Sequence, residues 1–379
     1  MCPVIFKKVR SKIMTFLQRA NQGVQSLSPY QAGKPIEELE RELGITNIIK
    51  LASNENPFGF PESAKNAIRE QLDSLTRYPD SNGFTLKQTI AKKFGLKPEQ
   101  ITLGNGSNDL VELFAHTFVS EHDEVIFSQY AFIVYPLITK AINAVAREIP
   151  AKNWGHDLDG FLAAINEKTK LIYISNPNNP TGNFLTHNEI DAFLAKVRSD
   201  IIVVLDEAYT EFTAKEERVD SFALLKKYPN LVVSRTLSKA YGLAGLRIGY
   251  AAANEEITGL FNRVRQPFNV NSLALAAAVA VLNDDAFVDK VAENNRHELK
   301  RYEAFCQQYG LKYIPSKGNF ITIDFERPAA SIYDALLHEG VIVRPIAGYG
   351  MPNHLRVSIG LPQENDRLFS ALIKILNLK

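Results

Sequence analysis

Short apolar runs rich in β-branched residues recur through the chain, and amphipathic stretches lie between several of them. The runs occupy residues 101–103, 124–128, 171–175, 201–206, 231–235 and 247–253. Two of the intervening stretches, 108–119 and 187–198, repeat apolar residues at helical spacing. Apolar strands that alternate with amphipathic helices are typical of a mostly parallel sheet covered on both faces. The pattern therefore predicts an α/β fold.

The pattern changes near residue 290, after an Ala-rich helix expected at 272–282 and expected to be buried. A charged helical stretch at 290–310 precedes apolar strands near 319–325, 341–345 and 355–360. This different order of helices and strands predicts a smaller α+β C-terminal domain, and we expect the segment before residue 55 to pack against it. We divide the chain into four parts. Residues 1–25 are an N-terminal extension expected to be mobile, 26–55 an arm, 56–285 a large domain and 286–379 a small domain.

Composition and charge narrow the class of protein. Of the 379 residues 45% are hydrophobic and 22% charged, as in globular proteins, and the net charge of +1 gives no reason to expect a nucleic acid partner. The two cysteines, Cys2 and Cys306, cannot form a disulfide framework, which favours a reducing compartment such as the cytoplasm. No apolar run approaches the roughly 18 residues of a membrane helix.

The first twenty residues differ from the rest, because they carry five basic residues and no acidic one. A basic, acid-poor start can be an organelle transit segment. It can equally be an extension without function, upstream of a start at Met14, and we favour this second interpretation.

Candidate chemistry lies where predicted strands end, which is where open α/β sheets bind ligands. The sequence GNGSND follows Leu103 and indicates either a phosphate-binding turn or a tight turn with a helix cap. A dinucleotide fingerprint is excluded, because the next strand ends in Ser128 and Gln129 rather than an acidic residue. The loop NPNNPTG, 176–182, follows another strand and is either a rigid, hydrogen-bonding loop or a plain turn.

The ends of two further predicted strands carry the residues best suited to catalysis. Asp206 and Tyr209 follow one strand, and a buried carboxylate at that position needs a cationic partner. Lys239 follows the next, and a desolvated lysine amine is a nucleophile for an aldehyde. Taken singly, Asp206 could be a helix cap and Lys239 a surface charge. Pyridoxal phosphate would use all of these groups together, with its phosphate on Thr236, Ser238, Arg247 and the GNGSND backbone, and its ring on Phe132.

Two other site classes find no support. The seven histidines show no HExxH pattern and no paired cysteines accompany them, so the sequence predicts no metal site. A Ser–His–Asp hydrolase is excluded because the GxSxG turn is missing.

These motifs make the chain resemble the fold-type I pyridoxal-phosphate aminotransferases from about residue 27 to the C-terminus, leaving residues 1–25 outside. DEAY and SKAYGLAGLRIG are specific to that superfamily, and the elements SNENP and YPD narrow the resemblance to the histidinol-phosphate group and its aromatic-accepting relatives. The resemblance implies a large domain with a mostly parallel seven-stranded sheet covered by helices, a smaller α+β domain, and a homodimer.

The resemblance also implies roles for individual residues. Lys239 would bind the cofactor aldehyde, Asp206 would face the ring nitrogen, and Tyr209 and Asn179 would contact the ring oxygen. Phe132 would stack on the ring. The phosphate would be held by Gly106, Ser107, Asn108, Thr236, Ser238 and Arg247, and by Tyr78 of the other subunit. Substrate would be bound by Arg344, Arg356, Asn54 and Tyr30.

The implied activity is amino-group transfer between histidinol phosphate and 2-oxoglutarate, giving imidazole-acetol phosphate and glutamate, in histidine biosynthesis. The rival on the same scaffold is an aromatic-amino-acid or prephenate aminotransferase. A fold-type I lyase or decarboxylase would keep Lys239 and Asp206 but would have less need for two arginines. A cofactor-binding regulator usually adds a DNA-binding domain, for which 25 N-terminal residues are too few.

Overall fold

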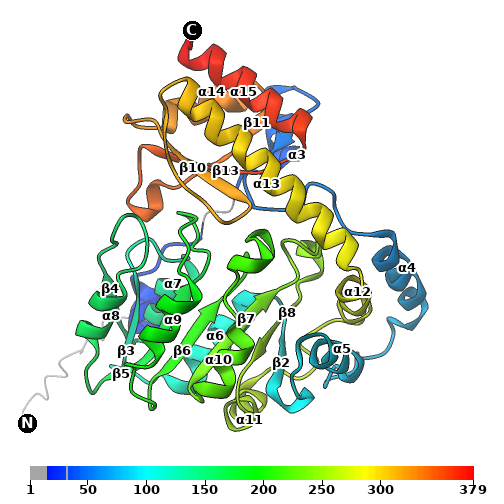
Figure 1. Ribbon diagram of the computed structural model, residues 1–379, viewed down its shortest axis with the longest axis vertical. Helices are drawn as coiled ribbons and strands as arrows, with labels where there is room; N and C mark the ends of the chain where they lie inside the picture. The colour runs from blue at the N-terminus through cyan, green and yellow to red at the C-terminus, as the bar shows by residue number, and fades with distance from the viewer. Residues whose placement is uncertain (1–14, 31–32) are drawn as a thin grey trace, which may run out of the picture.

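The computed structural model describes residues 15–30 and 33–379. Its strands form a seven-stranded sheet in the order β2-β8-β7-β6-β5-β3-β4, a four-stranded sheet in the order β12-β13-β10-β9, and the pair β1-β11. Figure 1 shows the large sheet in the lower part of the molecule and the small sheet above it, with the long helix α13 running from one part to the other.

The large sheet confirms the predicted α/β class. Its strands are β2 (Ile101–Gly104), β3 (Glu124–Ser128), β4 (Val145–Ile149), β5 (Thr169–Ser175), β6 (Ile202–Asp206), β7 (Leu231–Thr236) and β8 (Gly249–Ala252). Only β8 runs antiparallel to its neighbours, and the other adjacent pairs are parallel. Six of these strands match the predicted runs. The sequence pattern missed β4, because this edge strand buries none of its five residues and carries no apolar run.

Helices cover both faces of this sheet, and alternate strand residues supply the two cores. On one face α6 (Ser107–Phe118), α7 (Val134–Ala141) and α11 (Glu255–Val264) pack against Val125, Phe127 and Val204. On the other face α8 (Leu158–Ala164), α9 (His187–Leu194) and α10 (Ser221–Lys227) pack against Ile126, Val203 and Leu205. A third cluster beyond β2 contains side chains of α4 (Glu62–Gln71), α5 (Phe84–Phe94) and the Ala-rich α12 (Ser272–Leu282).

The C-terminal part has its own core, between the small sheet and its helices. Its elements are α13 (Asp285–Gln308), β9 (Lys312–Ile314), β10 (Phe320–Asp324), α14 (Ala330–His338), β11 (Val341–Ile342), β12 (Arg344–Pro345), β13 (His354–Ser358) and α15 (Pro362–Leu376). The small sheet is antiparallel, so this part has the α+β character that the change of pattern predicts.

Short 3-10 turns along the described chain occur at η1 (Leu72–Ser74), η2 (Pro98–Gln100), η3 (Thr210–Phe212), η4 (Lys215–Glu217), η5 (Ala244–Leu246) and η6 (Ala347–Tyr349).

The N-terminal segment contacts both parts of the molecule. Within it, α3 (Ile36–Leu43) packs Leu39 against Ile342, and β1 (Ile49–Lys50) pairs with β11 in parallel. Nearer the start, α1 (Phe16–Arg19) is followed by α2 (Gln22–Gln25), where the Gly23 amide donates a 2.7 Å hydrogen bond to the side chain of Asn143.

Most of the basic N-terminal stretch, residues 1–14, lies outside the described residues, as does the alternative start at Met14. The targeting interpretation therefore stays a prediction. Through residues 15–30 and 33–379, none of the helices combines the length and the apolar character that crossing a bilayer requires.

Candidate active site

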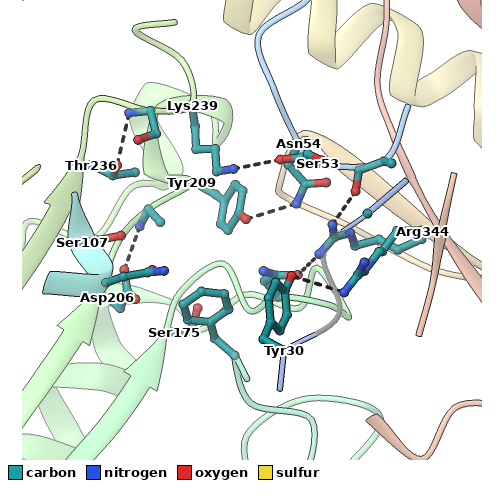
Figure 2. Close-up of a pocket in the computed structure, with 18 of the residues that line it drawn as sticks. Tyr30, Ser53, Asn54, Ser107, Ser175, Asp206, Tyr209, Thr236, Lys239 and Arg344 are labelled. Atoms are coloured by element: carbon teal, nitrogen blue, oxygen red, sulfur yellow. Dashed lines mark hydrogen bonds between the residues drawn. The ribbon is translucent and has the colours of Figure 1, made fainter. Parts of the chain in front are cut away.

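A cavity lies at the carboxyl ends of β5, β6 and β7, between the large sheet and the small domain. The turn before α6 and the segment after β1 complete its wall. Its lining contains every predicted site residue except Gly106 and Tyr78, and also residues that the sequence did not single out: Gly33, Ala52, Ser53, Ser175, Ala208 and Tyr349. Figure 2 shows Asp206, Lys239 and Tyr209 on one side of it, facing Asn54, Tyr30 and Arg344.

Asp206 is the last residue of the buried strand β6 and is 3% exposed. The Tyr135 hydroxyl donates a 2.7 Å hydrogen bond to its Oδ2, and the Ala208 amide donates one of 3.2 Å to its Oδ1. Burial raises the pKa of this carboxyl to about 6 in spite of these two bonds. The sequence predicted a cationic partner for Asp206, but its hydrogen-bond partners among the described residues are neutral.

Lys239 follows the end of β7 and projects into the cavity (Figure 2). Its Nζ donates a 3.0 Å hydrogen bond to the carbonyl oxygen of Ser53 and lies 5.9 Å from the centre of the Tyr209 ring. Burial, followed by the positive charge of Arg356, lowers the pKa of the amine to about 8. A larger fraction of Lys239 is therefore neutral, and nucleophilic, at neutral pH than of an exposed lysine.

Tyr209 is held from the small-domain side of the cavity. Asn54 donates a 3.1 Å hydrogen bond from Nδ2 to the Tyr209 hydroxyl. Asn54 is itself held by Ser358 of β13. The Ser358 Oγ accepts a 2.7 Å hydrogen bond from the backbone N–H of Asn54 and donates one of 3.0 Å to the Asn54 side-chain oxygen Oδ1. Burial raises the pKa of Tyr209 to about 12, so the phenol keeps its proton at neutral pH.

The turn before α6 lies against Arg247. Gly106 precedes the helix with a φ of +87°, a backbone conformation that favours glycine, and the place a Cβ would take lies 2.5 Å from Nη2 of Arg247. Arg247 Nη1 lies 3.5 Å from the hydroxyl of Ser238, and the Ser238 amide donates to Thr236 Oγ1 at 3.1 Å. A helix N-terminus, two hydroxyls and a guanidinium therefore converge on one end of the cavity, which suits an anion.

The opposite end carries the arginine pair of the small domain. Arg344 on β12 lies directly across from Arg356 on β13 in the antiparallel register. Arg344 donates a 3.2 Å hydrogen bond to the Tyr30 hydroxyl. The sequence placed both arginines at strand ends, but Arg356 lies in the middle of its strand.

Arg356 is buried and also orients Asn179. Its Nη1 donates to Asn179 Oδ1 at 2.5 Å and its Nη2 to the Ala52 carbonyl at 2.8 Å. Its Nε–H has no hydrogen-bond partner among the described residues. Since Oδ1 of Asn179 is occupied by the guanidinium, the Nδ2 amide of Asn179 is the group left to donate to a ligand.

Tyr78 lies outside the cavity and is 83% exposed. Its ring stacks on Phe268 at a centroid distance of 4.7 Å. Two large apolar rings thus cover one another on the surface of a single chain.

Sequence reasoning also missed Tyr135, which contacts Asp206. The segment YAFIVYP contains two other aromatic residues, and the motif assigned a role only to Phe132. No group of three or more His, Cys, Asp or Glu side chains within residues 15–30 and 33–379 is arranged to hold a metal ion.

Three comparisons bear on this site. Residues 46–372 match the family model described as aminotransferase class I and II. The chain is 84% identical over 366 residues to "Histidinol-phosphate aminotransferase 1" of Mannheimia succiniciproducens, covering 97% of this chain and 100% of that protein. It is 78% identical to "Histidinol-phosphate aminotransferase 2" of Haemophilus influenzae strain 86-028NP, covering 96% of this chain and 99% of that one.

A solved structure is also similar. The crystal structure of histidinol-phosphate aminotransferase from Sinorhizobium meliloti, in complex with pyridoxal-5′-phosphate, superposes with a TM-score of 0.85 at 28% identity. The similarity covers 95% of this chain and 98% of the other.

Proposed function

Because this chain belongs to the class I and II aminotransferase family, we propose that it binds pyridoxal 5′-phosphate and transfers an amino group between L-histidinol phosphate and 2-oxoglutarate. The products are imidazole-acetol phosphate and glutamate, and the reaction is a step of histidine biosynthesis. The proposal explains both ends of the cavity, one suited to the cofactor phosphate and the other to an anionic substrate.

The observation that carries this proposal is the pairing of Lys239 and Asp206 in one cavity. Burial favours the neutral form of both groups, with pKa values of about 8 and about 6. An aldehyde would react with the neutral amine. A pyridinium nitrogen would supply the cationic partner that is missing among the hydrogen-bond partners of Asp206 in the described part of the chain. The residues present therefore fit pyridoxal phosphate.

When bound, the cofactor supplies an electron-accepting ring, which stabilises negative charge at the substrate Cα. The ionised carboxylate of Asp206 holds a proton on the ring nitrogen and so maintains that capacity. With the cofactor bound, the Nζ of Lys239 would hold its aldehyde carbon and, as a free amine, would move a proton at the substrate Cα. Tyr209 and Asn179 each present a donor, O–H and Nδ2–H, for the ring oxygen.

Binding groups position the reacting atoms. The cofactor phosphate would be held by the backbone amides of Ser107 and Asn108, the hydroxyls of Thr236 and Ser238, and the guanidinium of Arg247. Phe132 lines the same cavity and would pack against the ring. Fixing the phosphate orients the ring relative to Lys239. The free energy of phosphate binding thereby offsets the entropy lost when the reacting atoms are brought into position.

Arg344 and Arg356 bind the anionic end of either substrate in turn. Tyr30, which contacts Arg344, and Asn54, which contacts Tyr209, line the same cavity beside them. Histidinol phosphate carries no carboxylate, so its phosphate is the group that an arginine pair recognises. 2-Oxoglutarate and glutamate present carboxylates to the same pair.

We further propose that the enzyme works as a homodimer in the cytoplasm. The exposed stack of Tyr78 and Phe268 supports a partner subunit on that surface, with Tyr78 reaching the other subunit's cofactor phosphate. The low cysteine content supports a reducing compartment.

A substrate panel tests the proposed activity. The purified, cofactor-loaded protein is assayed with histidinol phosphate, phenylalanine, tyrosine and aspartate as amino donors to 2-oxoglutarate. We expect the highest kcat/KM for histidinol phosphate. If phenylalanine or tyrosine has the higher value, the aromatic aminotransferase replaces this assignment.

A further inference from the structure

Tyr135 contacts Asp206 from behind the cavity. It lies on α7, is fully buried and does not line the cavity itself. Its hydroxyl donates the 2.7 Å hydrogen bond to Oδ2 of Asp206, the shorter of the two bonds that this carboxylate accepts from the described residues. None of the roles proposed above uses this tyrosine.

The surrounding structure fixes the Tyr135 ring. It stacks on the ring of Tyr173 from β5, with a centroid distance of 4.4 Å and an interplanar angle of 4°. Tyr173 is fixed in turn, because its hydroxyl donates a 2.8 Å hydrogen bond to the carbonyl of Val111 in α6. The Tyr135 hydroxyl is thus presented to Asp206 by two packed rings on two elements.

Tyr135 also contacts the residue expected to stack on the cofactor. The Phe132 ring lies edge-on to it, with a centroid distance of 5.8 Å and an angle of 84°. The Tyr135 amide donates a 3.0 Å hydrogen bond to the Phe132 carbonyl. One buried side chain therefore contacts both Asp206 and Phe132, which would meet the ring at its nitrogen and on its face.

Two effects around Asp206 disfavour its ionised form, and hydrogen-bond donors oppose them. Glu207, the next residue along, carries a like charge that disfavours ionisation of Asp206, as does burial. The phenols of Tyr173 and Tyr209 lie near enough to interact electrostatically with the carboxylate. Among these side chains only Tyr135 hydrogen-bonds to Asp206, and a donor to a carboxylate favours its ionised form.

We propose that Tyr135 is a positioning residue, which orients the Asp206 carboxylate and the Phe132 ring for the cofactor and favours the ionised form of Asp206. This inference rests on the proposed function for its purpose, but the bond to Asp206 exists without the cofactor. It can therefore be tested on the apoprotein, where failure of the proposed function would not affect the result.

The test measures the pKa of Asp206 in the apoprotein by NMR of ¹³C-labelled aspartate carboxyls, with Asp206→Asn identifying the signal. Tyr135→Phe keeps the ring and removes the donor. A hydrogen bond to a charged group changes proton affinity by about tenfold to a hundredfold, so the pKa should rise by about one to two units. Pyridoxal phosphate should also bind about tenfold more weakly.

Tyr173→Phe is the matched control, because it removes an equally buried hydroxyl from the partner ring but leaves the bond to Asp206. It should leave the pKa of Asp206 nearly unchanged. Site-specific 3-fluorotyrosine at position 135 is a stronger donor and should lower that pKa, which keeps the test available if Tyr135→Phe folds poorly.

An unchanged pKa of Asp206 in folded Tyr135→Phe, or equal shifts in both phenylalanine variants, would overturn the inference. So would an unchanged or raised pKa with 3-fluorotyrosine. Failure of the wild-type protein to bind pyridoxal phosphate would instead count against the proposed function alone.

Discussion

At the scale of single residues, burial moves the ionisation of Lys239 and Asp206 in opposite directions. The pKa of the amine falls to about 8 and that of the carboxyl rises to about 6, because both charged forms are poorly solvated. The neutral amine is the form that attacks an aldehyde. The charged carboxylate is the form that pairs with a pyridinium, and on the proposed function binding of the cofactor would supply that pairing.

The Lys239 shift predicts how the rate of cofactor attachment depends on pH. Below its pKa of about 8 the amine is protonated and unreactive, so the rate should rise about tenfold per pH unit and level off above pH 8. An exposed lysine would level off only near pH 10.4. Stopped-flow absorbance after mixing apoprotein with pyridoxal phosphate follows the band of the lysine-bound cofactor.

Lys239→Ala is the control for this measurement. It should bind the cofactor through the phosphate but develop no such band and show no turnover. A rate that does not change between pH 6 and 9, or a band that persists in the variant, would remove Lys239 from this role.

At the scale of secondary-structure elements, β12 and β13 bring two arginines together. Like charges directly opposite one another in an antiparallel pair are destabilising, yet Arg344 and Arg356 occupy such positions. An anion bound between them, as the proposed function requires, would compensate the repulsion. Their place on neighbouring strands of a packed sheet would fix the geometry of such a site.

Arg344→Ala should lower kcat/KM for histidinol phosphate by about ten- to a hundredfold, the loss expected for a hydrogen bond to a charged group. Arg356→Ala should cost at least as much, because Arg356 also holds Asn179. Arg327 is an exposed arginine of the same domain, so Arg327→Ala is the matched control. It should leave kcat/KM for histidinol phosphate near the wild-type value. Steady-state kinetics with histidinol phosphate and phenylalanine make the comparison.

We expect phenylalanine, which offers one carboxylate, to be less sensitive to loss of Arg344 than histidinol phosphate is. If Arg344→Ala leaves histidinol phosphate turnover unchanged, the arginine pair is not the phosphate site.

The elements themselves were largely predictable from sequence. Buried parallel strands are continuous apolar runs, which is why β5, β6 and β7 and the residues at their ends were found. The edge strand β4 was not found, because its exposed VAREI sequence lacks that signal. Asp206 and Lys239 were found as candidates because a charged residue at, or within a few residues of, the end of such a strand is unusual.

Contacts between distant segments could not be predicted in this way. The bond from Asn54 to Tyr209 joins residues 155 positions apart, and the one from Lys239 to Ser53 joins residues 186 apart. Tyr135 reads as one more apolar residue of a short helix. Only the packing of α7 on the sheet brings its hydroxyl to Asp206.

At the scale of the whole molecule, the cavity is built from three separate parts of the chain. The large sheet supplies Lys239 and Asp206, the segment after β1 supplies Asn54, and the small domain supplies Arg344 and Arg356. Tyr78 lies outside the cavity of its own chain, which suits a residue that serves a neighbouring subunit.

Subunit mixing tests whether sites are shared. Tyr78→Phe and Lys239→Ala are each expected to be impaired as homodimers. A heterodimer of the two would have one site with both lesions and one site with neither, so activity should reappear on mixing. If heterodimers form, as shown by differential tagging, and no activity returns, each site is built from one chain.

The first half of the reaction, studied alone, tests whether histidinol phosphate is the amino donor. The cofactor-loaded protein is mixed with histidinol phosphate in the absence of 2-oxoglutarate, and absorbance and imidazole-acetol phosphate are measured together. We expect the band of the lysine-bound cofactor to disappear with one equivalent of product per bound cofactor, and 2-oxoglutarate then to restore the band as glutamate forms. If histidinol phosphate leaves the band unchanged while phenylalanine discharges it, histidinol phosphate is not the substrate.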